Sequence, residues 1–161
     1  MNRQFKSSQE MVDEWEKKQE LKSTPKLILN RIRTPDGTIL TSYNVHDYVT
    51  HTDLNGYEYM VDGGLDYLRR NVNDIAYEEL SVTDDAPFKQ IRESLHWGTY
   101  GKKADQPLKY VPICNMTKDH LQAIIRQKML KSTKKDWVLA YLQKELAYRK
   151  ENNIIMPNDF T

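Results

Sequence analysis

The chain has 161 residues, of which 39% are hydrophobic and 29% charged, a globular composition that excludes disorder along its whole length. The formal net charge of +1 argues against a general electrostatic nucleic-acid binder and against an acidic nucleic-acid mimic. The single cysteine, Cys114, excludes an internal disulfide and a Cys-rich zinc site.

Residues 1–24 are expected to form a helical arm that precedes a single α+β domain over residues 25–161. Ser7 and Glu10 have capping-box spacing, and acidic residues come early and lysines late in the predicted helix over residues 8–21. Its apolar stripe is thin, which suggests an arm docked on its own domain or on a partner. The segment lacks a long apolar run, so we expect neither a signal peptide nor a membrane span, and a cytoplasmic protein.

The pattern then changes to β-branched and aromatic residues. Residues 26–33 and 38–43 flank Thr34-Pro35-Asp36-Gly37, where proline presets φ and glycine accepts a positive φ, so a β-hairpin is predicted. A second predicted hairpin pairs residues 47–52 with residues 57–61. Together the two hairpins are expected to form a small antiparallel sheet of about four strands.

The following segments alternate between short elements and helices. Residues 65–72 are expected to form either a short helical turn or a further strand. A helix is predicted to begin at Asp84 or Asp85 and to end at Gly98, with Pro87 in its first turn. Its apolar face would consist of Phe88, Ile91 and Leu95.

Two more helices are predicted near the C-terminus. Thr117 is a predicted N-cap, and its neighbour Met116 and the fourth helical residue Leu121 have the spacing of a hydrophobic staple. The last helix is expected to begin near Ser132 or Thr133.

The last helix has a predicted buried stripe of Val138, Leu139, Leu142 and Leu146. Glu145 and Arg149 are four residues apart, and we expect them to form an ion pair on the solvent-exposed surface. The expected architecture is α+β: a helical arm, a small antiparallel sheet, and helices packed on one face of that sheet.

One polar cluster has residue types that bind metals: His46, Asp47, His51, Asp53 and Glu58. A two-residue or a four-residue hairpin loop would place His51 beside Glu58, whereas a three-residue loop would separate them. A convergent cluster could bind a divalent metal or position a general base. The alternative is a set of polar residues on the wet face of a sheet. The sequence shows no helical His-x-x-x-His that would complete a zinc site.

A glycine pair, Gly63 and Gly64, is followed by Arg69 and Arg70. Glycines let backbone amides approach a ligand, and arginines bind phosphate or carboxylate. The segment matches neither the P-loop nor the Rossmann glycine spacing, so no cofactor is predicted. The alternative is a plain turn after a strand.

The segment from Trp97 to Lys103 combines two aromatic residues, two glycines and two lysines. Trp97, Tyr100, Lys102 and Lys103 could stack on a base, contact phosphate, or contact a protein. The alternative is a helix C-cap in which Trp97 packs in the core and the lysines are solvated.

Several motifs follow one another within residues 26–150: Thr34-Pro-Asp-Gly, His46-Asp-Tyr-Val-Thr-His, Val61-Asp-Gly-Gly-Leu-Asp-Tyr-Leu-Arg-Arg, Trp97-Gly-Thr-Tyr-Gly, Pro107-Leu-Lys-Tyr-Val and Met116-Thr-Lys-Asp-His-Leu. In this order they resemble a group of small tailed-bacteriophage proteins for which no activity is established. The resemblance implies a phage source and a setting in the host cytoplasm.

Three functional hypotheses follow. The first is a non-enzymatic phage accessory protein that binds a host or defence factor stoichiometrically, as an inhibitor does, through the glycine pair, the two arginines and the segment 97–103. The second is a nucleotide or nucleic-acid binder that uses the arginines for phosphate and the aromatic rings for stacking. The third is a metal-assisted hydrolase at the His and Asp cluster. A homodimer through Trp15 and the last helix fits the pattern, as does a monomer.

Overall fold

The computed structural model describes residue 9, residues 25–44 and 46–63, the backbone of residues 69–71, and residues 76–131 and 137–156. The predicted helix over residues 8–21 therefore lies outside the described residues except for Gln9, which is helical. The predicted start of the last helix, near residue 132 or 133, also lies outside them.

The first sheet is built around β1 (Leu27–Arg33), which pairs antiparallel with β2 (Ile39–Ser42) on one edge. On its other edge β1 pairs with β6 (Glu78–Glu79) and β7 (Val82–Thr83). The predicted first hairpin is confirmed, and its turn is closed by a hydrogen bond from the Gly37 amide to the Thr34 carbonyl at 2.9 Å.

The second sheet contains β3 (Tyr48–Thr52), β4 (Glu58–Asp62) and β5 (Arg69–Asn71), in that order. The second predicted hairpin is confirmed, with a connection over residues 53–57. Strand β5 lies where a further strand was one of two expectations, and it pairs antiparallel with β4.

The two hairpins belong to different sheets, whereas the sequence suggested that one sheet contains both. Ile32 and Leu40 of the first sheet pack against Tyr59 and Val61 of the second, and all four side chains are at most 1% exposed. Each hairpin has an apolar face, and the two faces are removed from water together because the sheets pack against each other. The α+β class is confirmed, and so is the presence of an antiparallel sheet of about four strands, but β6 and β7 occupy the places in it that were expected for the second hairpin.

The second half of the described chain contains α2 (Phe88–Ser94), β8 (His96–Thr99), β9 (Lys109–Pro112), the 3-10 turn η1 (Ile113–Asn115), α3 (Lys118–Lys131) and α4 (Trp137–Glu151). Helix α2 ends before Gly98, contrary to the prediction. Leu95 adopts an extended conformation at the helix end, and Trp97 then pairs with Val111 of β9. The partner strand, distant in sequence, overrides the local helical pattern.

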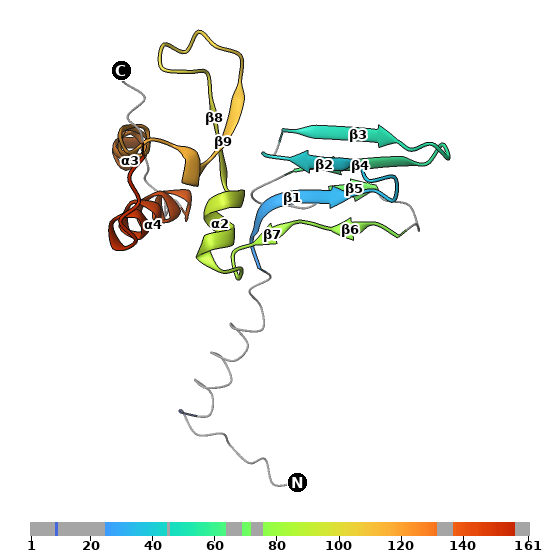
Figure 1. Ribbon diagram of the computed structural model, residues 1–161, viewed down its shortest axis with the longest axis horizontal. Coiled ribbons are helices and arrows are strands. Elements are labelled where there is room, and N and C mark those ends of the chain that lie inside the picture. Colours follow the sequence, from blue (N-terminus) through green and yellow to red (C-terminus); the bar gives the residue numbers. More distant parts are fainter. Residues whose placement is uncertain are drawn as a thin grey trace, which may run out of the picture.

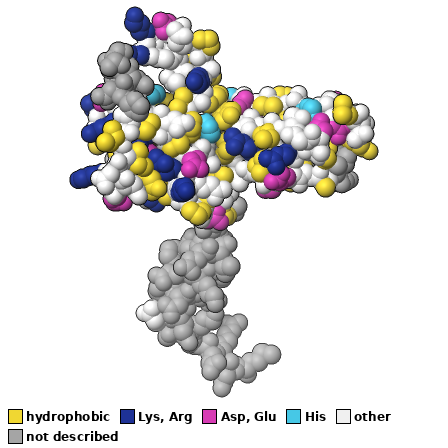
Figure 2. All heavy atoms as spheres, in the orientation of Figure 1, with side chains coloured by type: hydrophobic (Ala, Val, Ile, Leu, Met, Phe, Trp, Pro, Cys, Tyr) yellow, Lys and Arg dark blue, Asp and Glu magenta, His cyan; other side chains and the backbone are white. Residues whose placement is uncertain are grey.

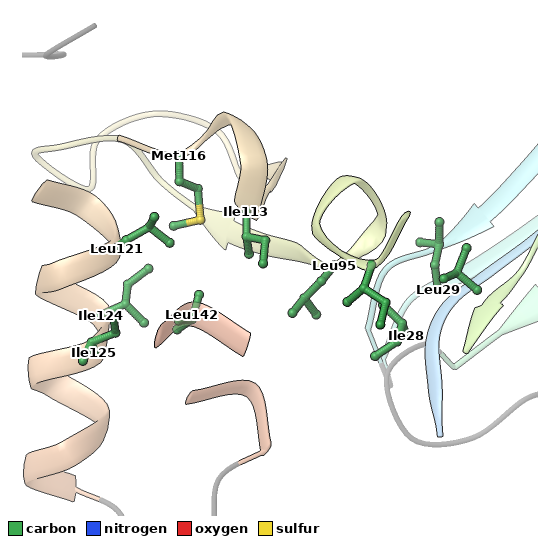
Figure 3. Packing of buried hydrophobic residues seen from close by; sticks show 11 residues of the cluster. Ile28, Leu29, Leu95, Ile113, Met116, Leu121, Ile124, Ile125 and Leu142 are labelled. Carbon is green, nitrogen blue, oxygen red and sulfur yellow. The ribbon is translucent and has the colours of Figure 1, made fainter. Parts of the chain in front are cut away.

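The largest hydrophobic cluster lies between the helices, η1 and the start of β1 (Figure 3). Met116 and Leu121 are both buried in it, as expected for the predicted staple. The hydroxyl of Thr117 accepts a hydrogen bond from the His120 amide at 3.2 Å, which confirms the predicted N-cap. The helices lie to one side of the sheets (Figure 1).

Strand β1 contributes to both hydrophobic clusters. Ile28 and Leu29 pack with the helices, whereas Ile32 packs between the sheets. The strand therefore links the helical half to the two-sheet half shown in Figure 1. Among the described residues, the helices are too short and too polar to span a lipid bilayer.

Candidate functional site

The His and Asp cluster does not converge. The register pairs His51 with Tyr59 and Thr52 with Glu58, so His51 and Glu58 point to opposite faces of the sheet. The reason lies in the connection, where Asp53 Oδ1 accepts hydrogen bonds from the amides of Asn55 at 2.8 Å and Tyr57 at 3.0 Å. These bonds hold a loop one residue longer than the four-residue loop considered from the sequence.

His51 instead reaches the turn of the first hairpin. Its Nε2 lies 2.8 Å from Oδ2 of Asp36, and both side chains are about three-quarters buried or more. Hydrogen bonds from the Thr34 hydroxyl, from His51 and from the Thr38 amide hold the pKa of Asp36 well below its ordinary value. The pair thus fastens the turn of one sheet to a strand of the other.

The carboxylates of Asp47 and Asp53 have local structural roles. Asp47 Oδ2 accepts a hydrogen bond from the Tyr43 amide at 2.9 Å, and the His46 amide donates to the side chain of Asn44. Asp53 is buried, and Tyr59 donates a hydrogen bond from its hydroxyl to it. Within the described ranges, no three metal-ligating side chains lie close enough to hold an ion. The geometry gives the metal-hydrolase hypothesis no support.

Gly63, the first residue of the glycine pair, is held by a hydrogen bond from a buried asparagine. Asn30 Nδ2 donates to the carbonyls of Gly63 at 2.9 Å and Asp62 at 3.0 Å, and Asn30 is fully buried. This contact ties the end of β4 in the second sheet to β1 in the first, which gives Gly63 a structural role. Gly64 lies outside the described residues. For Arg69 and Arg70 the structure describes the backbone, which pairs with Asp62 and Val61.

The segment from Trp97 to Lys103 forms the first strand and part of the loop of a hairpin between β8 and β9. Trp97 is half-buried against the main cluster, and Lys128 Nζ lies 5.2 Å from the centre of its ring. Tyr100 is 54% exposed, and Lys102 and Lys103 are exposed. The aromatic residues therefore differ in role, because Trp97 anchors the hairpin while Tyr100 faces solvent.

Three rings fasten the base of this hairpin to the sheets. Tyr43, at the end of β2, stacks on Tyr110 with ring centres 4.8 Å apart and meets His96 edge-on at 4.7 Å. Asn44 donates a hydrogen bond to the Tyr110 hydroxyl. Burial raises the pKa of Tyr110 and lowers that of His96, so both rings are neutral at neutral pH. These contacts attach the base of the hairpin to the end of β2.

The hairpin loop, residues 100–108, is held by hydrogen bonds within its backbone and by one to the side chain of Thr99. The Gln106 amide donates to the Tyr100 carbonyl at 2.8 Å, and the Ala104 amide donates to the Gly101 carbonyl at 3.2 Å. The Gly101 amide donates to the Thr99 hydroxyl at 3.2 Å. These bonds order a loop that projects from the body of the molecule (Figure 1).

A cleft of about 440 Å³ lies between the hairpin and the start of α3. The hairpin supplies Thr99, Gly101 and Lys102, and the opposite wall includes Asn115, Thr117, Asp119 and His120. The size is within the range of small-ligand sites, and the walls combine donors, acceptors and one carboxylate. Pattern analysis of the sequence did not find the α3 side, because the hairpin and α3 meet only in the folded chain.

The structure does not unite the two segments predicted to form one surface. Strand β5, which carries Arg69 and Arg70, lies in the two-sheet half, whereas the loop over residues 100–108 projects from the other half (Figure 1). The hairpin and its cleft are therefore the candidate site. The sequence matches no protein-family model, and no match was found among curated proteins or solved structures. The functional argument therefore depends on the geometry.

A buried charge cluster was missed by the sequence patterns. Glu145 is fully buried and Arg149 is 5% exposed, so the predicted surface pair is wrong. Glu145 also accepts two hydrogen bonds from Arg92 of α2, and Arg149 Nη2 donates to the carbonyls of Ile113 and Cys114. Spacing of four residues indicates that two side chains meet but says nothing about their depth.

Proposed function

We propose that the protein is a non-enzymatic binding protein that contacts another protein stoichiometrically through the β8–β9 hairpin. The observation that carries the proposal is an ordered, projecting loop with exposed apolar side chains. Tyr100 is 54% and Leu108 is 46% exposed, and Lys102 and Lys103 lie between them in the sequence. Exposed aromatic and aliphatic groups on an ordered loop are typical of recognition surfaces.

The loop suits a partner with an acidic surface that also offers an apolar contact. Figure 2 shows basic, acidic and hydrophobic side chains together at the projecting end, where Figure 1 places the loop. Because the backbone bonds of the loop already exist in the free protein, binding loses less conformational entropy. The lysines would then speed association and make it depend on salt.

The resemblance to tailed-phage proteins supports a choice of partner class. We infer that the partner is a host enzyme or a defence factor in the host cytoplasm, and that binding inhibits it. This choice depends on analogy with small phage proteins that lack catalytic motifs.

A photo-crosslinking amino acid in the loop tests the proposal. Tyr100→p-benzoylphenylalanine in bacterial cells, with and without phage infection, is expected to yield one dominant protein adduct of 1:1 mass. Tyr48, which is 62% exposed on β3, is the matched control position and should give no such adduct. The Lys102→Glu/Lys103→Glu variant should suppress the adduct, and the purified partner should lose activity at one equivalent of protein.

Two outcomes would contradict the proposal. Equal adducts from positions 100 and 48 would mean that the loop is not the contact surface. An adduct that disappears with nuclease, together with a steep loss of affinity as salt rises, would favour the nucleic-acid hypothesis instead.

A further inference from the structure

A second and larger cleft lies between α3 and the end of α4, away from the hairpin loop. Its volume is about 780 Å³, which is within the range of sites that bind small molecules. The walls come from both helices and from the segment after α4: Lys118, Gln122, Leu146, Ala147, Arg149, Lys150 and residues 153–156.

The charge of the walls favours an anion. Lys118, Arg149 and Lys150 line the cleft, and none of its described lining residues is acidic. Lys118 is also the first residue of α3, where the backbone amides and the helix dipole add positive potential. Three cationic side chains near a helix N-terminus repel one another, and a bound anion would relieve that repulsion.

Arg149, which lines the cleft, belongs to a buried charge cluster that carries an excess positive charge. Arg92 and Arg149 share the single carboxylate of Glu145, so the buried cluster has two positive charges and one negative charge. Side-chain exposure is 11% for Arg92, 5% for Arg149 and 0% for Glu145, so solvent screens this excess poorly.

One guanidinium nitrogen of Arg149 donates no hydrogen bond within the described part of the chain. Nε donates to Glu145 at 2.6 Å, and Nη2 donates to the Ile113 carbonyl at 2.8 Å. Nη1 is buried and has no hydrogen-bond partner in the described part of the chain. A buried guanidinium nitrogen without an acceptor costs free energy, and an anionic oxygen that reached it after a movement of the side chains around it would satisfy both its hydrogen bond and its charge.

The apolar part of the wall favours an aliphatic group over an aromatic base. Leu146 and Ala147 meet Ile154, Ile155 and Met156, and no described lining residue is aromatic. Ile155 is 92% exposed, so a chain that lay against it would remove a large apolar side chain from water. Base recognition normally uses stacking on aromatic side chains, which the described lining lacks.

We propose that this cleft binds a small amphipathic carboxylate, with its head group at Arg149 and the two lysines and its aliphatic chain along Leu146 and residues 154–156. The site is separate from the β8–β9 hairpin and does not depend on the proposed protein contact. Failure of one proposal therefore leaves the other unaffected.

Titration with decanoate below its micellar concentration tests the site. We expect saturable 1:1 binding by calorimetry, with methyl resonance shifts confined to Leu146, Ile154, Ile155 and Met156 and a shift of the Arg149 guanidinium protons. Acetate, which lacks the chain, and decyltrimethylammonium, which reverses the head-group charge, should bind at least about tenfold more weakly. Equal binding of the cationic analogue would overturn the proposal.

A charge-reversal pair provides the matched control. Lys118→Glu/Lys150→Glu alters two exposed side chains of the cleft and should weaken decanoate binding about tenfold. Lys109→Glu/Lys131→Glu makes the same change in net charge on exposed residues outside the cleft and should change affinity by less than about twofold. Equal effects of the two double variants, or resonance shifts scattered over the surface, would show that decanoate does not occupy this cleft.

Discussion

Glu145 in α4 accepts two hydrogen bonds from Arg92 in α2, from Nε at 2.7 Å and from Nη2 at 2.6 Å. This fork joins two helices that are far apart in sequence. Arg149 completes the contact by bridging Glu145 to the backbone of η1. The orientation of α4 against α2 and η1 is therefore fixed by directional polar bonds as well as by hydrophobic packing.

Loss of the central carboxylate should strongly destabilise the protein. Glu145→Ala leaves two buried guanidinium groups without their shared anion, and the free energy of unfolding should fall by about 3–5 kcal/mol. Glu151→Ala, at an exposed position in the same helix, should change it by less than about 0.5 kcal/mol. Urea unfolding of both variants measures the difference. Similar stabilities would contradict the role assigned to the buried cluster.

Acidification should destabilise the base of the hairpin through His96. Burial lowers the pKa of His96 below its ordinary 6.5. The unfolded chain then binds more protons than the folded chain, so stability is lost as the pH falls below 6.5. His96→Asn keeps a donor for the Ser94 carbonyl but does not titrate. Unfolding curves between about pH 7.5 and pH 5.5 should show a smaller loss for this variant than for the native chain.

The Asp36 and His51 pair should stabilise the folded state at neutral pH and lose that effect in acid. The pKa of Asp36 is lower in the folded chain than its ordinary 3.8, so the contribution is complete well above 3.8 and falls as the pH drops through the folded value. Asp36→Asn should therefore be less stable than the native chain near neutrality. The difference should shrink below about pH 3. A difference independent of pH would refute the assignment.

Gly37 and Gly101 both have a left-handed backbone, but only at Gly101 would an added Cβ also collide with a side chain. Substitution of each by alanine therefore distinguishes the cost of backbone strain from the cost of a steric contact. Gly37 has φ +88° with open space where a Cβ would lie, whereas Gly101 has φ +81° and a Cβ there would lie 2.7 Å from Gln106 Cγ. Gly37→Ala should cost about 1–2 kcal/mol from the backbone alone. Gly101→Ala should cost more and should also reduce crosslinking from position 100. If both substitutions lowered the free energy of unfolding equally, the loop would have to accommodate the added methyl group at position 101 without further cost.

Local signals in the sequence predicted local structure well. Thr34-Pro35-Asp36-Gly37 indicated the first hairpin, and Thr117 with Met116 and Leu121 indicated the start of α3, because turn and cap chemistry involve neighbouring residues. The α+β class followed from the order of these elements. The placement of the two hairpins in facing sheets required contacts that a one-dimensional pattern does not encode.

The incorrect predictions arise from contacts that the local sequence pattern does not contain. Trp97 enters a strand because β9 pairs with it from beyond a loop, and the sequence between them carries no alternating pattern that announces the pairing. His51 misses Glu58 because the side chain of Asp53 lengthens the hairpin loop. Of the candidate site, Tyr100 and Lys102 were found from composition, whereas the α3 wall of the cleft required the fold.

The two-sided pairing of β1 has a consequence for synthesis on the ribosome. Strand β2 follows β1 directly and can pair at once, but Glu78, whose carboxylate bonds to Arg33, is made 45 positions later. Until then one edge of β1 lacks its native partner, and the segments that cover Ile28 and Leu29 have not yet emerged. A nascent chain paused after the second hairpin thus exposes a strand edge whose backbone N–H and C=O groups lack their native partners. Contact with a chaperone would matter most during this interval.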